Sequence, residues 1–163
     1  MALPIINLSI LNGNNGFRLD GEAASDESGR SVSNAGDVNG DGFDDVIVGA
    51  PGADSNGLSS GSSYVVFGKS TGFSAAMNLS SLDGNNGFRV DGAPSVTLGY
   101  SVSGAGDING DGFSDLIIGA FFADPNGNGS SYVVFGKASG FSATLDVSSL
   151  NGSNGFRVDG SSV

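Results

Sequence analysis

The fold is decided by a nine-residue stretch, DVNGDGFDD at Asp37–Asp45, that returns as DINGDGFSD at Asp107–Asp115. Both copies place oxygen-bearing side chains at positions 1, 3, 5 and 9 and glycines at positions 4 and 6. A hard cation needs six or more oxygens that converge within about 2.3–2.6 Å. Glycine permits the positive φ angles that such a tightly coiled loop requires. The spacing therefore predicts two loops that each hold one divalent cation.

The predicted ligands are the side chains at positions 1, 3, 5 and 9 and the backbone carbonyl at position 7. They are Asp37, Asn39, Asp41, Phe43 and Asp45 in the first loop and Asp107, Asn109, Asp111, Phe113 and Asp115 in the second. Two calcium ions per chain are expected, because an all-protein oxygen cage suits Ca²⁺ whereas Mg²⁺ keeps several waters. Zinc is disfavoured because the chain has no histidine and no cysteine. The alternative is an Asx-rich turn that binds nothing, since Asp, Asn and Gly favour turns in any case.

The residues that follow each loop exclude an EF-hand. Position 12, where the EF-hand needs a bidentate glutamate, is Val48 in the first copy and Ile118 in the second. These residues lie in the short apolar runs Val46–Ala50 and Leu116–Ala120. Short runs rich in β-branched residues are typical of buried strands. We therefore expect each loop to lead into a strand whose position-12 residue faces a core.

Composition restricts the fold and the function. The chain has 163 residues and 29 glycines, and no long window shows a 3.6-residue apolar period, so an all-β fold is predicted. The formal net charge of −11 disfavours nucleic-acid binding. No segment approaches the ~20 apolar residues of a membrane span. Nucleophile–base pairs built on histidine or cysteine cannot exist here, and the clustered aspartates are better explained as ligands, so we expect no enzyme activity.

The chain is a duplication with a partial third copy. GFRLDG at Gly16–Gly21 returns as GFRVDG at Gly87–Gly92 and at Gly155–Gly160, and YVVFGK at Tyr64–Lys69 returns at Tyr132–Lys137. A period of about 70 residues fits a unit of four strands with generous connections. Each aromatic that recurs in register is expected to pack in the core.

Four strands are expected in each copy, with the cation loop as the hairpin between the first and second strands. The expected first strands are Gly29–Ser33 and Gly99–Ser103, the second Asp45–Gly49 and Asp115–Gly119, the third Ser63–Gly68 and Ser131–Gly136, and the fourth Gly16–Asp20, Gly87–Asp91 and Gly155–Asp159. The recurring arginines of the fourth strands, Arg18, Arg89 and Arg157, either bind a carboxylate ligand, pair with the aspartates of the same motif, or carry charge that discourages sheet addition.

In order, these motifs are Gly-x-Ser-Val-Ser, Ala-Gly-Asp-x-Asn-Gly-Asp-Gly-Phe-x-Asp, Gly-Ala-Pro and Tyr-Val-Val-Phe-Gly. This order resembles the FG-GAP repeat, which builds the β-propeller of integrin alpha chains and is similar to arrays in bacterial surface proteins. The resemblance implies one four-stranded antiparallel propeller blade per repeat, two blades per chain, and a calcium loop between the two inner strands. It also implies the same ten ligand residues. The implied divisions are an N-terminal segment 1–21 with a fourth strand from a preceding blade, a first blade 22–92 and a second blade 93–163.

The second copy departs from the family pattern at one turn. Gly49-Ala50-Pro51 of the first copy becomes Gly119-Ala120-Phe121 in the second, although the cation ligands are intact. In addition, the residue before the first-strand glycine is Ser28 or Leu98, where the family often has Phe.

Two blades do not close a ring, because propellers typically have 4–8 blades. Further blades from the same parent chain, homo-oligomerisation or an open stack are the three solutions. The function that the resemblance implies is a calcium-stabilised module for adhesion or protein recognition, secreted or at the cell surface, with a protein or glycan ligand. The alternatives are a non-catalytic accessory region of a secreted hydrolase or toxin, and a carbohydrate-binding propeller.

Overall fold

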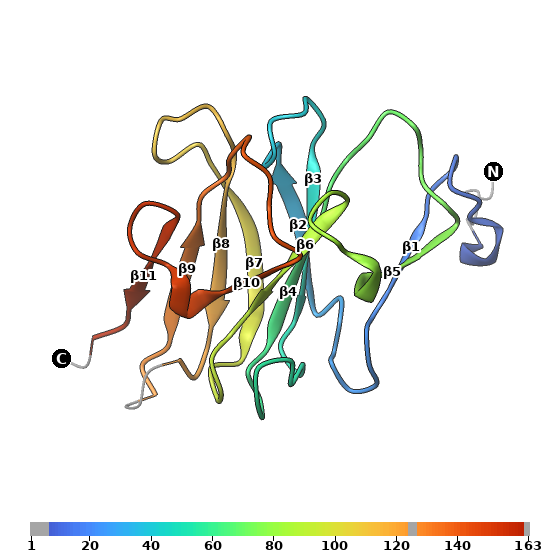
Figure 1. Cartoon of the computed structure of the whole chain (residues 1–163). Coiled ribbons are helices and arrows are strands. Elements are labelled where there is room, and N and C mark those ends of the chain that lie inside the picture. Colours follow the sequence, from blue (N-terminus) through green and yellow to red (C-terminus); the bar gives the residue numbers. More distant parts are fainter. Residues whose placement is uncertain (1–6, 124–126, 162–163) are drawn as a thin grey trace, which may run out of the picture.

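The computed structural model describes residues 7–123 and 127–161, which form short strands joined by turns and by 3₁₀ helices of three residues each (Figure 1). Most of these strands are antiparallel neighbours within the two larger of three sheets. The predicted all-β class is therefore confirmed. No helix among these residues is long and apolar enough to cross a membrane.

Two similar four-stranded antiparallel units form the body of the molecule. The first unit contains β2 (Ser31–Gly36), β3 (Asp45–Ala50), β4 (Ser62–Val66) and β6 (Gly87–Asp91), in that spatial order. The second unit contains β7 (Leu98–Gly106), β8 (Asp115–Ala120), β9 (Ser130–Val134) and β11 (Gly155–Asp159). Both units keep one register, because Val48 pairs with Tyr64 just as Ile118 pairs with Tyr132. The strands of the described residues do not close into a ring.

The bounds of the fourth strands β6 and β11 agree with the prediction, whereas those of the first strands differ. β2 and β7 run on to Gly36 and Gly106, directly before the aspartate-rich loops, and not to Ser33 and Ser103. A register shift between Asn34 and Gly36 lets the ladder continue. The Asn34 side chain supports this irregularity by accepting a hydrogen bond from the Gly36 N–H at 2.8 Å. The third strands also differ, since they end at Val66 and Val134.

Two short strands that the sequence did not predict each make a parallel pairing. β5 (Ala76–Asn78) pairs with β1 (Arg18–Asp20), and β10 (Thr144–Asp146) pairs with β6. Each of β5 and β10 lies in the connection between the third and fourth strands of its own unit. The connection in each unit therefore pairs with the fourth strand that precedes this unit along the chain. That strand is β1 for the first unit and β6 for the second. A 3₁₀ helix follows each, η2 (Leu79–Ser81) and η3 (Val147–Ser149), as η1 (Leu8–Ile10) precedes β1.

The recurring arginines pair within their own strands. Arg89 Nε lies 2.8 Å from Asp91 Oδ1, and Arg157 Nε lies 2.7 Å from Asp159 Oδ1. Arg18 makes the same contact with Asp20. The intramotif pairing that we considered for these arginines is therefore present in all three copies.

The core lies on both faces of the first unit. One face packs against the second unit through fully buried side chains that include Ile47, Val65 and Phe88 on one side and Leu116 and Ile118 on the other. The opposite face buries Val48, Tyr64, Val66 and Leu79, with Leu19, Phe73 and Met77 packed against them. Val48 and Ile118, the position-12 residues, thus face cores as expected.

Candidate metal centres and an aromatic surface

Both aspartate-rich loops lie between the first two strands of their units, at the same end of the array. The first loop joins β2 to β3 and the second joins β7 to β8. The glycines at positions 4 and 6 have positive φ angles in both loops, 76° and 88° for Gly40 and Gly42 and 79° and 92° for Gly110 and Gly112. A side chain would be strained at these positions, so the coil depends on glycine.

The aspartate at position 1 organises the first loop. Asp37 Oδ1 accepts hydrogen bonds from the N–H groups of Gly40 at 2.7 Å and Asp41 at 3.1 Å. Asp37 Oδ2 accepts from the Gly42 N–H at 2.9 Å. The carboxylate therefore points into the coil, and three backbone donors converge on it.

Positions 3 and 5 face one another. Asn39 Oδ1 accepts from the Asp41 N–H at 3.0 Å, and the Asn39 side-chain amide donates to Asp41 Oδ2 at 3.0 Å. Asp41 Oδ1 accepts from the Phe43 N–H at 2.9 Å. The side chains at positions 1, 3 and 5 therefore all accept hydrogen bonds from the loop backbone, although Asp41 is also exposed to solvent.

Asp45 at position 9 is the buried member of the first loop. It is only 1 % exposed, and its two oxygens accept from the Val38 N–H and the Gly68 N–H, each at 2.9 Å. Burial raises the pKa of Asp45 to about 6, against the lowering effect of these two hydrogen bonds, and the charges of Asp41 and Asp37 raise it further. The charges of the carboxylates at positions 1 and 5 thus act on the carboxylate at position 9.

The second loop repeats these contacts. Each hydrogen bond of the first loop recurs between the equivalent residues of the second, with distances of 2.7–3.0 Å. The side chains involved are those of Asp107, Asn109, Asp111 and Asp115. Asp115 is fully buried. Two separate segments with the same spacing therefore adopt the same structure.

The donor set of each loop fits calcium in its chemistry, because it consists of carboxylate and amide oxygens. Each carboxylate oxygen that accepts one N–H keeps a second lone pair. Within residues 7–123 and 127–161, however, no group of three or more acidic, imidazole or thiol side chains is gathered as tightly as a metal cage. The side-chain nitrogen of Asn39 also faces Asp41. For Asn39 to coordinate a cation in the loop, its side-chain amide must rotate so that the oxygen faces the ion.

The two loops contact each other directly. The Ser114 N–H donates to the Asp37 carbonyl at 2.9 Å, and the Lys137 N–H donates to the Val38 carbonyl at 2.9 Å. A Cβ atom on Gly40 would collide with the Phe113 ring, so this ring packs over the first loop. The ring of Phe43, the equivalent position-7 residue, is 41 % exposed.

An exposed aromatic cluster lies at the opposite end of the strands. The rings of Tyr100 and Phe121 stack with centroids 5.5 Å apart, and Phe122 meets Phe121 edge-on at 4.7 Å. The Arg30 guanidinium lies 4.9 Å from the centre of the Tyr100 ring. The three aromatic residues are 45–58 % exposed. We call Arg30, Tyr100, Phe121 and Phe122 the aromatic surface.

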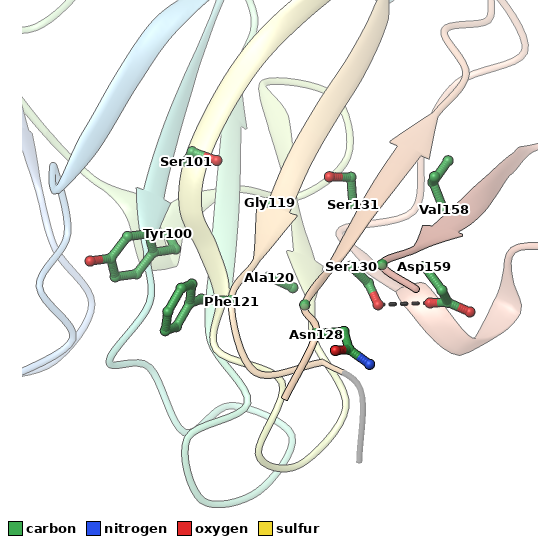
Figure 2. Close-up of a pocket in the computed structure, with 12 residues that line it drawn as sticks. Tyr100, Ser101, Gly119, Ala120, Phe121, Asn128, Ser130, Ser131, Val158 and Asp159 are labelled. Carbon is green, nitrogen blue, oxygen red and sulfur yellow. Dashed lines mark hydrogen bonds between the residues drawn. The ribbon is translucent and has the colours of Figure 1, made fainter. Parts of the chain in front are cut away.

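A hollow of about 410 Å³ adjoins the aromatic surface on the outer face of the second unit (Figure 2). Its floor is a row of residues paired across the sheet, Ser101, Gly119, Ser131 and Val158. Asp159 lies at one side, where it accepts a hydrogen bond from the Ser130 hydroxyl at 2.7 Å. The floor residues on β7, β8 and β9 are serine or glycine. Because their side chains are small or absent, they leave the hollow open above the sheet.

The sequence analysis missed the aromatic surface, although it carried a signal. Phe121 stands where the first copy has Pro51, and Tyr100 stands where it has Arg30. Aromatic residues that recur in register are packed in at least one copy, as Phe88 is, whereas Tyr100, Phe121 and Phe122 have no aromatic counterpart in the first copy and are exposed. The departure from the repeat was therefore the informative feature.

Comparison with known proteins agrees with this architecture. Residues 28–66 and 98–134 match the family model of the FG-GAP repeat. The chain contains two FG-GAP repeats. Each matched segment begins just before or at the first strand of a unit and ends at its third strand, so both include the aspartate-rich loop.

The relatives of these FG-GAP repeats include integrin alpha chains. The chain is 37 % identical to integrin alpha-V of Gallus gallus over 98 residues, 59 % of this chain and 9 % of that protein. It is 37 % identical to integrin alpha-PS5 of Drosophila melanogaster over 121 residues, 74 % of this chain and 11 % of that protein. Integrin alpha-4 of Xenopus laevis is 34 % identical over 98 residues. The chain spans about a tenth of the length of these relatives.

Proposed function

We propose that this chain is a calcium-stabilised propeller module that serves adhesion or protein recognition outside the cell or at its surface. The likeness to integrin alpha chains supports this role and location. The observation that carries the calcium assignment is the duplication of one loop geometry, with inward-turned oxygens at positions 1, 3 and 5 and a buried aspartate at position 9. The calcium ions are structural and the module is not catalytic.

The calcium ligands are the ten residues predicted from the sequence. In the first loop Asp37, Asp41 and Asp45 supply three carboxylates, Asn39 an amide oxygen and Phe43 a backbone carbonyl; the second loop does the same. When bound, calcium neutralises the repulsion between these carboxylates and joins the ends of the first two strands. Because the ion binds the folded loop only, it raises the free energy of unfolding by mass action.

Isothermal titration of the full chain with CaCl₂ tests the assignment. We expect two ions per chain with dissociation constants in the range of extracellular calcium modules, about 10⁻⁴–10⁻³ M. The Asp37→Asn/Asp107→Asn variant should lose both binding events. Asp54→Asn is the matched control, because Asp54 is an aspartate in a turn outside both loops. Absence of calcium binding by the wild-type chain, or unchanged binding by the double variant, would remove the calcium assignment.

The aromatic surface is the part of the module that we assign to recognition. Tyr, Phe and Arg side chains dominate the energy of many protein interfaces, because they bury large areas and retain a polar or charged group. Here three aromatic rings of the second unit are exposed beside the Arg30 guanidinium of the first unit, and the three rings have no aromatic counterpart in the first unit. They are therefore free of the packing role that the recurring phenylalanines have.

Adhesion of cultured cells to a surface coated with the full chain tests this assignment. A Tyr100→Ala/Phe122→Ser variant should reduce the adhering fraction at least about fivefold, since loss of two interface anchors costs more than 1 kcal/mol. Leu58→Ser is the control, because Leu58 is an exposed apolar residue far from the aromatic surface in the sequence. Equal adhesion of both variants would contradict the assignment. Binding to a glycan array that the same double variant abolishes would favour the carbohydrate-binding alternative.

A further inference from the structure

The contact between the two units serves as a template for two surfaces that carry exposed apolar residues, although β1 and β5 cover part of one of them. We call the face of the second unit that points away from the first the tail face, and the face of the first unit that points away from the second the head face. β11 and β1 mark these two ends of the array (Figure 1). Four features of the contact between the two units recur on the tail and head faces. In each feature, a face carries one of the two groups that meet in the internal contact but not the other.

The first feature is a stacked pair of phenylalanines. Phe88 of the first unit stacks on Phe141 of the second with ring centroids 4.2 Å apart, and Phe17 stacks on Phe73 at 4.1 Å. Phe156 is the third member of the series Phe17, Phe88 and Phe156. It is 39 % exposed and meets only the Phe135 ring, edge-on, among the described aromatic contacts. The tail face thus offers a stacking surface for a residue like Phe73 or Phe141.

The second feature is a pair of aliphatic positions on the strands. Ile47 and Val90 are fully buried beneath the second unit, whereas their counterparts Ile117 and Val158 are 38 % and 52 % exposed on the tail face. The converse holds on the head face. Val102 is 8 % exposed where it packs on the first unit, and its counterpart Val32 is 63 % exposed.

The third feature is the hollow. On the first unit, the row Ser31, Gly49 and Ser63 is covered by the start of β7. A side chain on Gly49 would collide with the Gly99 carbonyl, and the Val102 N–H donates to the Ser31 hydroxyl at 3.0 Å. The same row on the second unit forms the floor of the hollow in Figure 2. Gly29, the counterpart of Gly99, has open space around it on the head face.

The fourth feature links the two loops. The Phe113 ring packs over Gly40, as described above. On the tail face Gly110, the counterpart of Gly40, has nothing within 4 Å of a Cβ position. On the head face Phe43, the counterpart of Phe113, is 41 % exposed. Each vacant position on the tail face therefore has its matching residue on the head face of the same chain.

We propose that the tail face binds the head face of a second copy of this chain, in the geometry of the contact between the two units. Gly29 and Val32 of the second copy then enter the hollow, and its Phe43 covers Gly110. β11 takes the place that β1 holds on the second copy, because GFRVDG at Gly155–Gly160 repeats GFRLDG at Gly16–Gly21. β1 is exchangeable, since it has three residues and β5 is its one partner among the described strands. The contact joins unlike faces, so it builds head-to-tail chains or a ring, and it does not depend on calcium binding.

Sedimentation velocity of the full chain with two matched variants tests this proposal. Val158→Asp blocks the tail face and Val32→Asp blocks the head face, each by burying an unpaired carboxylate in the contact. We expect wild-type assemblies that grow with concentration, in calcium and in chelator, and dissociation constants at least about tenfold higher for each variant alone. A mixture of the two variants should form dimers and nothing larger, because each contributes one intact face. Leu58→Asp should assemble like the wild type.

A wild-type chain that stays monomeric up to millimolar concentration would overturn the proposal. So would variants that assemble like the wild type, or a mixture that stays monomeric. Disulfide trapping tests the exchange of β1 for β11 directly, because the chain has no cysteine of its own. Val90 pairs with Leu145 and Leu19 with Met77, so Val158→Cys/Met77→Cys should link different chains. Leu19→Cys/Met77→Cys, the control, should close within one chain. Exclusively monomeric Val158→Cys/Met77→Cys after oxidation would exclude the exchange.

Discussion

The first and second units are alike in register and unlike in burial. Their hairpins, loops and third strands pair residue for residue, yet Phe88 is fully buried where Phe156 is 39 % exposed. The difference arises because the first unit has neighbours on both faces, whereas the second has a neighbour on one. Local sequence therefore sets the conformation of a repeat, and the adjacent repeat sets how much each side chain contributes to stability.

The largest expected difference between the units concerns this pair of phenylalanines. Phe88→Ala should lower the free energy of unfolding by about 3–5 kcal/mol, because it leaves a cavity in the core. Phe156→Ala should lower it by less than about 1.5 kcal/mol, because the ring is partly in water already. Urea unfolding at a concentration where the chain is monomeric measures both. Equal losses would show that burial between the units does not govern stability.

The next largest effect should be equal in the two units. Asp45 and Asp115 each bridge two backbone N–H groups while buried. Asp45→Asn and Asp115→Asn replace one carboxylate oxygen by a donor that faces an N–H group. Without calcium and at pH 8, each should cost about 2–3 kcal/mol, since a buried donor is left unpaired. Asp44→Asn is the adjacent exposed control. A clear inequality between Asp45→Asn and Asp115→Asn would contradict the equivalence of the loops.

A smaller effect should again separate the units. The Ser31 hydroxyl accepts a hydrogen bond from the Val102 N–H across the contact, so Ser31→Ala should cost about 1 kcal/mol. Ser101, its counterpart, lies in the floor of the hollow, and Ser101→Ala should change stability by less than about 0.5 kcal/mol. Thermal unfolding of the Ser31→Ala and Ser101→Ala variants measures how much the hydrogen bond between the two units contributes to stability.

The smallest expected effect is a difference in acid sensitivity at one turn. Asp83 accepts from the Asn85 and Asn86 N–H groups at 2.8 and 3.2 Å, and these hydrogen bonds lower the pKa of Asp83. Its stabilising contribution is therefore present above the pKa of the unfolded chain, about 3.9, and is lost as pH falls through the lower pKa of the folded chain. The second unit has Asn151 here.

Asp83→Asn should consequently make the melting temperature fall slightly less between pH 5 and pH 2 than it does in the wild type. The comparison of melting curves at the two pH values measures this. A steeper fall in the variant would reverse the sign that the hydrogen bonds predict.

The sequence predicted those parts of the fold that have a strong local signal. The second and fourth strands and the loop hairpins were predicted because β-branched runs are bounded by glycine and aspartate. β5 and β10 were missed, since three residues such as Ala76–Asn78 are too few to show an alternating pattern. They form because each pairs with the edge of a neighbouring fourth strand. This pairing depends on the tertiary structure and not on the local sequence.

The ten proposed calcium ligands stay a prediction from spacing. What the structure adds is that the glycines of both loops have the positive φ angles that a coiled loop requires. The contact of Asp45 with the Gly68 N–H joins residues that are 23 positions apart, so no local pattern indicates it. The aromatic surface depends on which residues are brought together at the strand ends, and the sequence pointed to it only through departures from the repeat, Phe121 for Pro51 and Tyr100 for Arg30.

The most direct test of the central claim is a crystal structure of the full chain grown in millimolar CaCl₂. The account predicts one ion in each loop, with oxygens of Asp37, Asp41 and Asp45, and of their counterparts in the second unit, at about 2.3–2.6 Å from it. It also predicts that the amide oxygens of Asn39 and Asn109 turn toward the ions. Loops that hold no ion at this calcium concentration, with the hydrogen bonds between Asn39 and Asp41 unchanged, would contradict it.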